Sequence, residues 1–326
     1  MFNKIKVIVL FLLISSFSFA KISVSGFLKE KINTVISKEE TMQSTNETLI
    51  EEYEEEKLEG EQLEYEDGKI KYKFYYKNGE KLPKYYEYYP NGSLKISNEM
   101  EIYYEEDTKI SNGTYIEYDN KGKVIKKEQY KNNKLTGEYI GKDRQAYSGF
   151  IVVNYLDGEL NGAYIRFYEN GKKRVETKYI KDKLEGEYKE YYENGKPKLI
   201  SNYKDDQLNG KYLSYYEDGK LESSCYYKEN ELNGECIKYY TNGKVKEKSS
   251  FKNGIIDGEL IEYHENGNMK TKTKSINGKL NGECSYYYES GKLKETRIYK
   301  DNSLNGENVL YYENGKISKK QNYVNW

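Results

Sequence analysis

The sequence predicts an all-β protein, an elongated single-layer twisted sheet or solenoid built from about eleven 24-residue β-hairpin repeats. Three observations support this fold class. Glycines recur at a constant interval, Asn-Gly pairs separate short tyrosine-containing segments, and Tyr replaces the aliphatic residues of an ordinary core. The 326 residues include 39 Tyr, 9 Phe and one Trp, and 33% of the chain is charged. This composition is too poor in aliphatic residues for a thick core and too aromatic for disorder.

Two glycine series run along the chain in phase, each with a constant 24-residue interval. The first usually follows Asn or Asp and precedes Lys, and it comprises Gly171, Gly195, Gly219, Gly243, Gly267, Gly291 and Gly315. The second lies in segments such as KLEGEY and comprises Gly162, Gly186, Gly210, Gly234, Gly258, Gly282 and Gly306. Self-similarity at a fixed period is typical of a repeat architecture in which each unit packs only against its neighbours.

The repeats extend toward the N-terminus with two irregularities, and we assign them to residues 49–326. Gly68 and Gly92 keep the 24-residue interval, but the next interval, from Gly92 to Gly122, is longer by six positions, which indicates an insertion at 98–110. Residues 141–150 form a degenerate unit, in which Ala146 occupies the expected turn position.

Each unit has the sequence of a β-hairpin. Asn-Gly between strand-like segments is the strongest short hairpin signal, because a two-residue type I′ turn needs positive φ at both central positions. Such a turn at Asn194-Gly195 pairs Tyr192 with Pro197, Glu190 with Leu199, and Tyr188 with Ser201. Alternation along the strands then places Tyr188, Tyr192 and Tyr203 on one face and Lys189 and Tyr191 on the other. Tyrosines of successive units form ladders, and we expect their rings to be buried while their hydroxyls stay hydrated.

The N-terminus resembles a secretory signal. Lys4 and Lys6 precede the apolar segment 7–14, and Ser18 and Ala20 form a small-x-small end, so residues 1–20 are predicted to be a cleaved signal peptide. Residues 21–48 form a leader for which a short amphipathic helix and a mobile segment are equal alternatives. We expect an exported bacterial protein, in the periplasm, at the cell surface or secreted, with no transmembrane segment after cleavage.

Composition and motifs exclude several functions. The 53 basic and 54 acidic residues nearly balance, so a nucleic-acid partner is not expected. No nucleophile elbow, zinc-protease motif or phosphate-binding loop occurs, and the single histidine, His264, falls in a column otherwise filled by Tyr. We therefore predict no enzyme activity, no catalytic residues, no cofactor and no metal site.

The phrase YYENGK followed by a KLxGEY-type segment, repeated with the 24-residue period, resembles the bacterial variant of the MORN repeat. The resemblance covers roughly residues 49–326, and it implies a β-hairpin solenoid with a binding role. Proteins of this kind include exported repeat proteins and YwqK-type antitoxins, which are proposed to neutralise a cognate toxin. Ordinary MORN repeats contain a tryptophan that these units lack, so the phospholipid association ascribed to some MORN proteins is not carried over.

Repeated tyrosines between Lys and Glu predict a non-catalytic scaffold for protein–protein interaction, with an antitoxin-like or immunity-like role as one form of it. The partner is an unknown protein, for which a toxin and an envelope protein are both candidates. Tyr is enriched in protein interfaces, which favours this interpretation. The candidate partner-binding residues form one column of the sheet: Tyr191, Tyr215, Tyr239, Tyr263, Tyr287 and Tyr311. The alternatives are a surface repeat protein that binds cell-wall glycan and a purely structural role for the tyrosines.

The three cysteines allow at most one bond within the chain. Register counting places Cys225 opposite Cys236 on neighbouring strands, where an oxidising compartment allows a disulfide. Cys284 lies two units farther along the same column, so we expect it to be free. A register shifted by one residue would instead turn Cys225 and Cys236 to opposite faces and leave three thiols.

Overall fold

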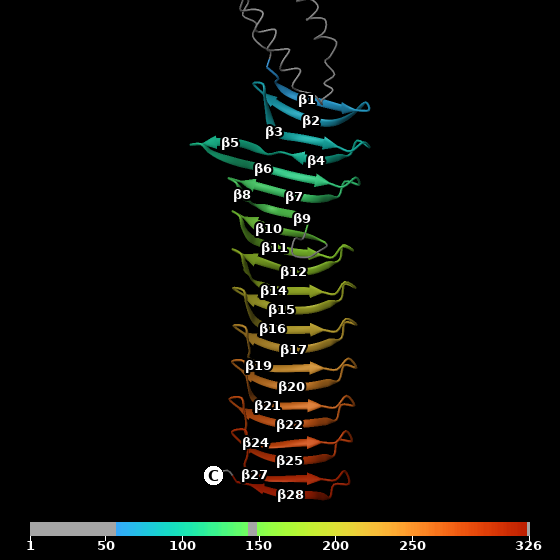
Figure 1. Cartoon of the computed structure of the whole chain (residues 1–326), viewed down its shortest axis with the longest axis vertical. Helices are drawn as coiled ribbons and strands as arrows, with labels where there is room; N and C mark the ends of the chain where they lie inside the picture. Colours follow the sequence, from blue (N-terminus) through green and yellow to red (C-terminus); the bar gives the residue numbers. More distant parts are fainter. Residues whose placement is uncertain (1–56, 143–148, 325–326) are drawn as a thin grey trace, which may run out of the picture. The chain divides into compact units, whose positions relative to one another are not determined.

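The computed structural model describes residues 57–142 and 149–324, and these form one antiparallel sheet without a helix. The predicted signal peptide and leader lie outside the described residues. Leaving aside β5 and five strands of two residues, 22 strands lie side by side in chain order, two for each of eleven units (Figure 1). At about 4.8 Å per strand, the sheet is on the order of 100 Å long. The predicted all-β repeat fold is confirmed.

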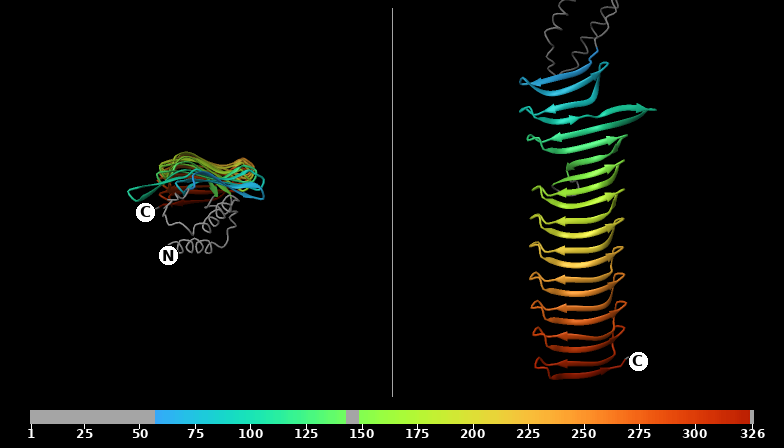
Figure 2. Two further views of the ribbon diagram at one scale, coloured as in Figure 1. Left: turned by 90° about the horizontal axis from the view of Figure 1, so that it is seen from above. Right: turned by 180° about the vertical axis from the view of Figure 1, so that it is seen from behind.

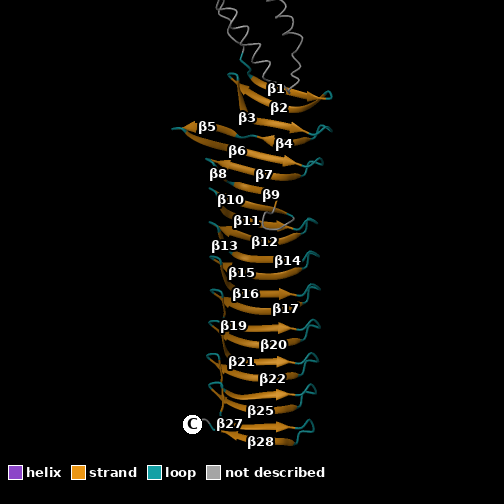
Figure 3. Ribbon diagram, in the orientation of Figure 1, coloured by secondary structure: helices purple, strands orange, loops and turns teal. Residues whose placement is uncertain are grey.

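The sheet is a single layer whose arched profile is visible along its long axis (Figure 2). Among the described residues, turns and short loops join its strands (Figure 3). Within the described residues, no helix is long and apolar enough to span a membrane.

The first half of the sheet contains the irregular units. Its strands are β1 (Gly60–Glu66), β2 (Lys69–Lys77), β3 (Glu80–Tyr88), β4 (Leu94–Asn98), β5 (Glu101–Glu105), β6 (Thr108–Tyr118), β7 (Val124–Lys131), β8 (Lys134–Leu135), β9 (Gly137–Lys142), β10 (Phe150–Leu156), β11 (Glu159–Phe167), β12 (Lys173–Ile180) and β13 (Lys183–Leu184).

The second half repeats one pattern. Its strands are β14 (Gly186–Tyr191), β15 (Pro197–Lys204), β16 (Gln207–Tyr215), β17 (Leu221–Lys228), β18 (Glu231–Leu232), β19 (Gly234–Tyr239), β20 (Val245–Lys252), β21 (Ile255–Tyr263), β22 (Met269–Ile276), β23 (Lys279–Leu280), β24 (Gly282–Tyr287), β25 (Leu293–Lys300), β26 (Ser303–Leu304), β27 (Gly306–Tyr311) and β28 (Ile317–Tyr323).

The Asn-Gly turn differs from the predicted type I′ turn. The Gly195 N–H donates to the Tyr192 carbonyl at 2.8 Å, and the Tyr192 N–H donates to the Lys196 carbonyl at 2.9 Å, which closes a three-residue loop. Gly195 has a φ of 92°, whereas Asn194 is not among the residues with positive φ. This is a type I turn followed by a left-handed glycine, which needs only one residue of positive φ. The adjoining bulge places Tyr191, not Tyr192, opposite Pro197, while the predicted pairs Glu190–Leu199 and Tyr188–Ser201 are present.

The type I′ turns lie at the opposite edge of the sheet. Asp205 and Asp206 have φ values of 50° and 66° and connect the pair Lys204–Gln207. The Asp206 N–H donates to the Leu184 carbonyl at 3.1 Å, and Asp206 Oδ1 accepts the Leu184 N–H at 2.7 Å. Asp206 thus attaches its own unit to the Lys-Leu segment of the preceding unit.

The Asn-Gly-Lys edge is joined from unit to unit in a comparable way. Asn194 Oδ1 accepts the Lys196 N–H at 2.8 Å, which fixes the turn, and Asn194 Nδ2 donates to the Glu217 carbonyl of the next unit at 3.0 Å. Lys196 Nζ donates to the Asp218 carbonyl of the same neighbouring turn at 2.6 Å. Asn and Lys therefore recur here because each turn uses their side chains to hold the next turn.

The core is a row of small side chains covered by tyrosine rings. On the face that carries Tyr188, called the Tyr188 face, successive strands place Tyr188, Ser201, Tyr212 and Cys225 opposite one another. Ser201 is 0% exposed and Cys225 is 5% exposed. Rings of neighbouring strands meet above them, as in the Tyr212–Tyr227 pair, whose centroids are 5.4 Å apart. Alternation of large and small residues thus buries the sheet centre without a second layer.

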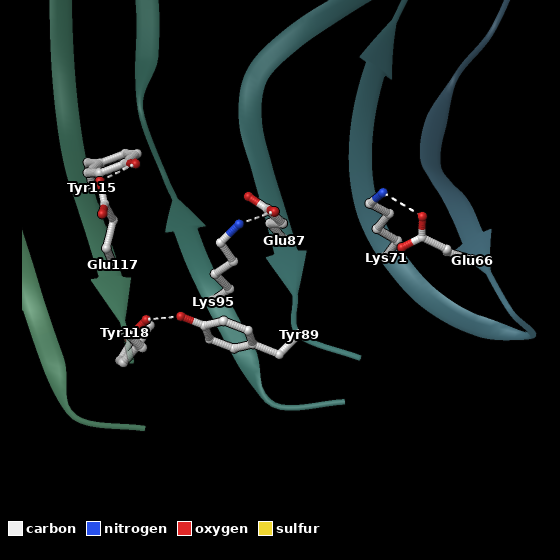
Figure 4. Close-up of polar contacts among 8 residues, drawn as sticks. All are labelled: Glu66, Lys71, Glu87, Tyr89, Lys95, Tyr115, Glu117 and Tyr118. Atoms are coloured by element: carbon white, nitrogen blue, oxygen red, sulfur yellow. Dashed lines mark hydrogen bonds and ion pairs between the residues drawn. The ribbon is translucent and has the colours of Figure 1, made fainter. Parts of the chain in front are cut away.

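A second tyrosine column fastens each unit to the next through its hydroxyl groups. The Tyr192 hydroxyl donates to the Tyr215 carbonyl at 2.7 Å, and the Tyr240 hydroxyl donates to the Tyr263 carbonyl at 2.7 Å. The same contact joins Tyr89 to the Tyr118 carbonyl at 2.8 Å, as Figure 4 shows beside the Lys95–Glu87 ion pair. The expectation that the ladder hydroxyls stay hydrated is wrong for this column, because the neighbouring strand end provides a backbone acceptor.

Replacing Tyr240 by Phe is expected to lower the free energy of unfolding by about 0.5–1.5 kcal/mol, the usual contribution of one intramolecular hydrogen bond. The matched control is Tyr239→Phe, because no hydrogen bond of the Tyr239 hydroxyl is found within the described residues. Urea unfolding followed by circular dichroism measures both variants. Equal losses in the two variants would contradict a specific role for the Tyr240 hydroxyl.

Candidate functional site

The predicted binding residues lie in one row on the face opposite to the Tyr188 face, called here the Tyr191 face. Each residue of the column is the last residue of its strand, so the turn that follows fixes its position. The column consists of Tyr191 on β14, Tyr215 on β16, Tyr239 on β19, Tyr263 on β21, Tyr287 on β24 and Tyr311 on β27. All six are half-buried, which leaves part of each ring accessible. The structure therefore brings the whole predicted set together.

An apolar residue on the adjacent strand stands opposite each tyrosine of the column. These partners are Pro197, Leu221, Val245, Met269, Leu293 and Ile317. Cross-strand pairs of an aromatic and an aliphatic residue stabilise a sheet by roughly 0.2–1 kcal/mol each. The column is consequently a continuous row in which aromatic and aliphatic side chains alternate.

A second row runs beside the column through the centre of the same face. Strand pairing places Leu213, Ser224, Ile237, Lys248 and Ile261 next to one another in that order. Three aliphatic residues thus flank the tyrosines two positions earlier on the same strands. The Tyr191 face is amphipathic over these units.

Polar contacts also lie on this face, both at the start of the column and beside Tyr263. The Tyr191 hydroxyl donates to Glu176 Oε2 at 3.1 Å, and Lys272 pairs with Glu259 at 2.9 Å. Partial burial, and secondly the hydrogen bond to Glu176, raises the pKa of Tyr191 above its ordinary value. At physiological pH Tyr191 is therefore a neutral hydrogen-bonding group.

The apolar partners of the column were not predicted from the sequence. Their signal was present, since an apolar residue stands two positions after the turn glycine in each of these units, from Pro197 to Ile317. The assumed two-residue turn placed Tyr192 opposite Pro197 and so hid this alternation. The bulge between Glu190 and Tyr191 corrects the register.

His264 occupies the structural column of Tyr192. Its Nε2 lies 3.3 Å from the Tyr287 carbonyl, the position that a tyrosine hydroxyl occupies in the other units. Among residues 57–142 and 149–324, no group of three His, Cys, Asp or Glu side chains is arranged to hold a metal ion. The geometry of His264 is that of a ladder residue.

The structure joins Cys225 on β17 to Cys236 on β19 in a disulfide, with 4.0 Å between the two Cα atoms. The neighbouring pair Ser224–Ile237 has the register that brings the two cysteines face to face. Cys284 is free and fully buried, and this burial raises the pKa of its thiol. The bond connects two consecutive repeats and so reinforces a boundary between units.

The profile of the MORN repeat variant matches the chain in nine segments: residues 58–78, 111–132, 160–181, 184–205, 208–229, 232–253, 256–277, 280–301 and 304–325. The chain belongs to the MORN repeat variant family. The family defines a repeat scaffold, and its units coincide with the hairpins described above. No curated protein matches the chain.

Among solved structures, this MORN-variant chain is similar to two that share 11% sequence identity with it. The Photorhabdus luminescens Tc holotoxin pore with mutant TccC3 matches 79% of this chain and 17% of its own, with a TM-score of 0.19. The crystal structure of TcdB2-TccC3-TEV matches 80% of this chain and 19% of its own, with a TM-score of 0.17. The chain thus spans less than a fifth of either one.

Non-reducing peptide mapping is expected to recover the peptides of Cys225 and Cys236 linked and that of Cys284 as a free thiol. Alkylation of Cys284 should require denaturation, because its side chain is buried. Three thiols that react in the native protein, or any bridge from Cys284 within one chain, would contradict this arrangement.

Burial raises the pKa of Tyr188 to about 12, from about 10 in an unfolded chain. Between about pH 10 and pH 12 the unfolded state therefore loses the Tyr188 proton before the folded state does, and the free energy of unfolding falls. Below about pH 10 both states keep the proton, so this contribution is constant. Urea unfolding of native protein and Tyr188→Phe across this range isolates the effect. The free energy of unfolding of the native protein minus that of Tyr188→Phe should be constant at lower pH and decline above about pH 10. A difference that stays constant to pH 12 would contradict the raised pKa of Tyr188.

Proposed function

We propose that this MORN-variant protein is a non-catalytic scaffold that binds a protein partner through the Tyr191 face. The observation that carries the proposal is the half-exposed row in which column tyrosines alternate with aliphatic residues. The rings of the Tyr192 column are half-buried too, but their hydroxyls are bonded to the backbone of the next unit. No hydrogen bond of the Tyr215, Tyr239 or Tyr263 hydroxyl is found among the described residues, so these hydroxyls are available to a partner.

The physical properties of the row favour a protein surface as its ligand. Tyrosine supplies a large rigid contact area at a small cost in side-chain entropy, and its hydroxyl retains a hydrogen-bonding group at the interface. Leu213, Ile237 and Ile261 extend the apolar strip beside the rings. A complementary partner is therefore elongated and carries an apolar strip of its own.

We also propose that the protein acts outside the cytoplasm of a bacterium. The support is the basic and apolar sequence of residues 1–20, together with the Cys225–Cys236 disulfide, since such bonds persist in oxidising compartments. An envelope protein and an exported toxin are the partner classes that agree with this location.

The test replaces Tyr215, Tyr239 and Tyr263 together by Ala. A partner captured from the envelope fraction is purified, and its affinity is measured for the native protein and for the variant. Loss of three central aromatic contacts should weaken binding by at least about tenfold, since interface aromatics often contribute more than about 1 kcal/mol each. Circular dichroism verifies that the sheet persists.

Two control proteins make the result specific. Tyr65→Ala with Tyr312→Ala removes rings that are 62% and 56% exposed outside the column, and it should leave affinity unchanged. Phe at the three column positions keeps the rings and should keep most of the affinity. Full affinity in the triple Ala variant would show that the Tyr191 face is not the binding surface, and unfolding would show that the tyrosines are structural. Competition by soluble cell-wall glycan would instead support the glycan alternative.

A further inference from the structure

One hairpin of the sheet is longer than all regular units and extends beyond the line of turns. The interval from Gly92 to Gly122 is six positions longer than the regular repeat, and the additional residues lengthen both arms of the hairpin β5–β6. Its tip is a type I′ turn at Glu106 and Asp107, with φ values of 46° and 64°. Figure 1 shows β5 and the start of β6 projecting past the neighbouring turns. The regular stack therefore does not cover this segment.

The geometry leaves one backbone edge of this hairpin unpaired. Along β5–β6, every second pair exchanges hydrogen bonds, beginning with the closing pair Glu105–Thr108. Ile102 and Tyr104 belong to the pairs in between, so their N–H and C=O groups point away from β6. The corresponding outward groups of β6 are used. Ser111 and Lys109 bond to Asn133, with the Ser111 N–H donating to Asn133 Oδ1 at 2.7 Å. Within the described part of the chain, the outward groups of Ile102 and Tyr104 have no such partner.

The side chains along this edge are exposed and predominantly acidic. Tyr104 is 69% exposed and Ile102 is 37% exposed, and both lie on one side of β5. Within residues 101–112, Glu101, Glu105, Glu106 and Asp107 accompany them, against one cation, Lys109. None of these four carboxylates has an ion pair among the described residues. Charge complementarity therefore favours a basic ligand.

A second copy of this chain is a poor occupant of the edge. Two β5 strands could pair in the antiparallel sense so that the outward backbone groups of both Ile102 and Tyr104 are hydrogen-bonded. This register is centred on Tyr103 and places Glu101 opposite Glu105 of the other copy. Like charges directly opposed across a pair of strands are destabilising. Lys or Arg at the same positions would turn this repulsion into attraction.

We infer that the outer edge of β5 binds an extended basic segment of a partner protein by β-strand addition. Backbone groups of the segment pair with Ile102 and Tyr104, which gives affinity, and its alternate Lys or Arg side chains face Glu101 and Glu105, which gives specificity. This surface is separate from the Tyr191 face and does not depend on the proposed function. The acidic tip explains how the edge stays free of self-association until a basic strand meets it.

The test uses the full chain and a labelled peptide of alternating Lys and Val, with fluorescence anisotropy as readout. Saturable binding that weakens with added salt is expected, and the analogous Glu-Val peptide should not bind. A Lys-Val peptide N-methylated at alternate residues keeps its charge but loses strand pairing, so it should bind at least about tenfold more weakly. Equal binding of the N-methylated peptide would overturn strand addition, and absence of binding by the Lys-Val peptide would overturn the proposal.

Variants of the chain localise the site. Tyr104→Pro removes an outward N–H without removing a β5–β6 hydrogen bond, so it should weaken binding more than Tyr104→Ala, which removes only the side chain. Glu101→Lys with Glu105→Lys should abolish binding. Glu229→Lys with Asp301→Lys makes the same change of charge in two other exposed turns and should reduce binding only slightly. Equal effects of the two double variants would overturn the assignment to β5.

Two further measurements separate binding at β5 from binding at the Tyr191 face and from self-association. Hydrogen exchange at the Ile102 and Tyr104 amides should slow when the Lys-Val peptide is added, and unchanged exchange would contradict the inference. The triple Ala variant of the Tyr191 face should bind the peptide like native protein, so failure of one proposal leaves the other standing. A dimer in sedimentation experiments that Tyr104→Pro dissociates would identify a second copy as the occupant and overturn the basic segment.

Discussion

The structure depends on hydrogen bonds and ring contacts that pass from each hairpin to the next. A single layer encloses no volume, so none of the described residues is buried by a distant strand of the sheet. An isolated hairpin of this length is marginal in water. Regular units are joined at three places. The Tyr192-type hydroxyl bonds to the next strand end, the Asn and Lys side chains bond to the next turn, and the Asp206-type carboxylate bonds to the preceding Lys-Leu segment. The free energy of unfolding is therefore nearly a sum of contributions from pairs of neighbouring units, as expected for a repeat protein.

This dependence explains the unusual composition. Tyr can cover a small buried residue with its ring and still reach a backbone carbonyl with its hydroxyl, whereas Leu can do only the first. Ser201 and Cys225 are buried because tyrosines of adjacent strands lie above them. On the other face, no hydroxyl of the Tyr191 column is bonded to a backbone carbonyl among the described residues. The same residue type thus joins successive units through its hydroxyl in one column and not in the other.

Regular repeats present nearly the same surface in every unit, and a different surface arises where a unit departs from the repeat. The six additional residues between Gly92 and Gly122 lengthen the hairpin β5–β6. Its tip therefore extends beyond the turns of the neighbouring units. Asn133 of the following unit bonds to one side of this hairpin, whereas no hydrogen bond from the preceding unit to β5 is found among the described residues. A local change in length therefore converts a structural strand into an exposed edge, while the units on either side keep their pairing.

The sequence determined the fold class, the 24-residue unit, the two strands per unit and the membership of the Tyr191 column, because period and alternation are properties of order along the chain. Register counting also brought Cys225 opposite Cys236. Only the tertiary structure decided the turn geometry. Asn-Gly is compatible with a type I′ turn and with a type I turn followed by a left-handed glycine, and the two differ by one residue in register. That residue determines whether Tyr191 or Tyr192 faces Pro197, and so which hydroxyls bond to the backbone. The choice depends on contacts with the neighbouring unit, such as Asn194 to Glu217 and Lys196 to Asp218, which no single repeat contains.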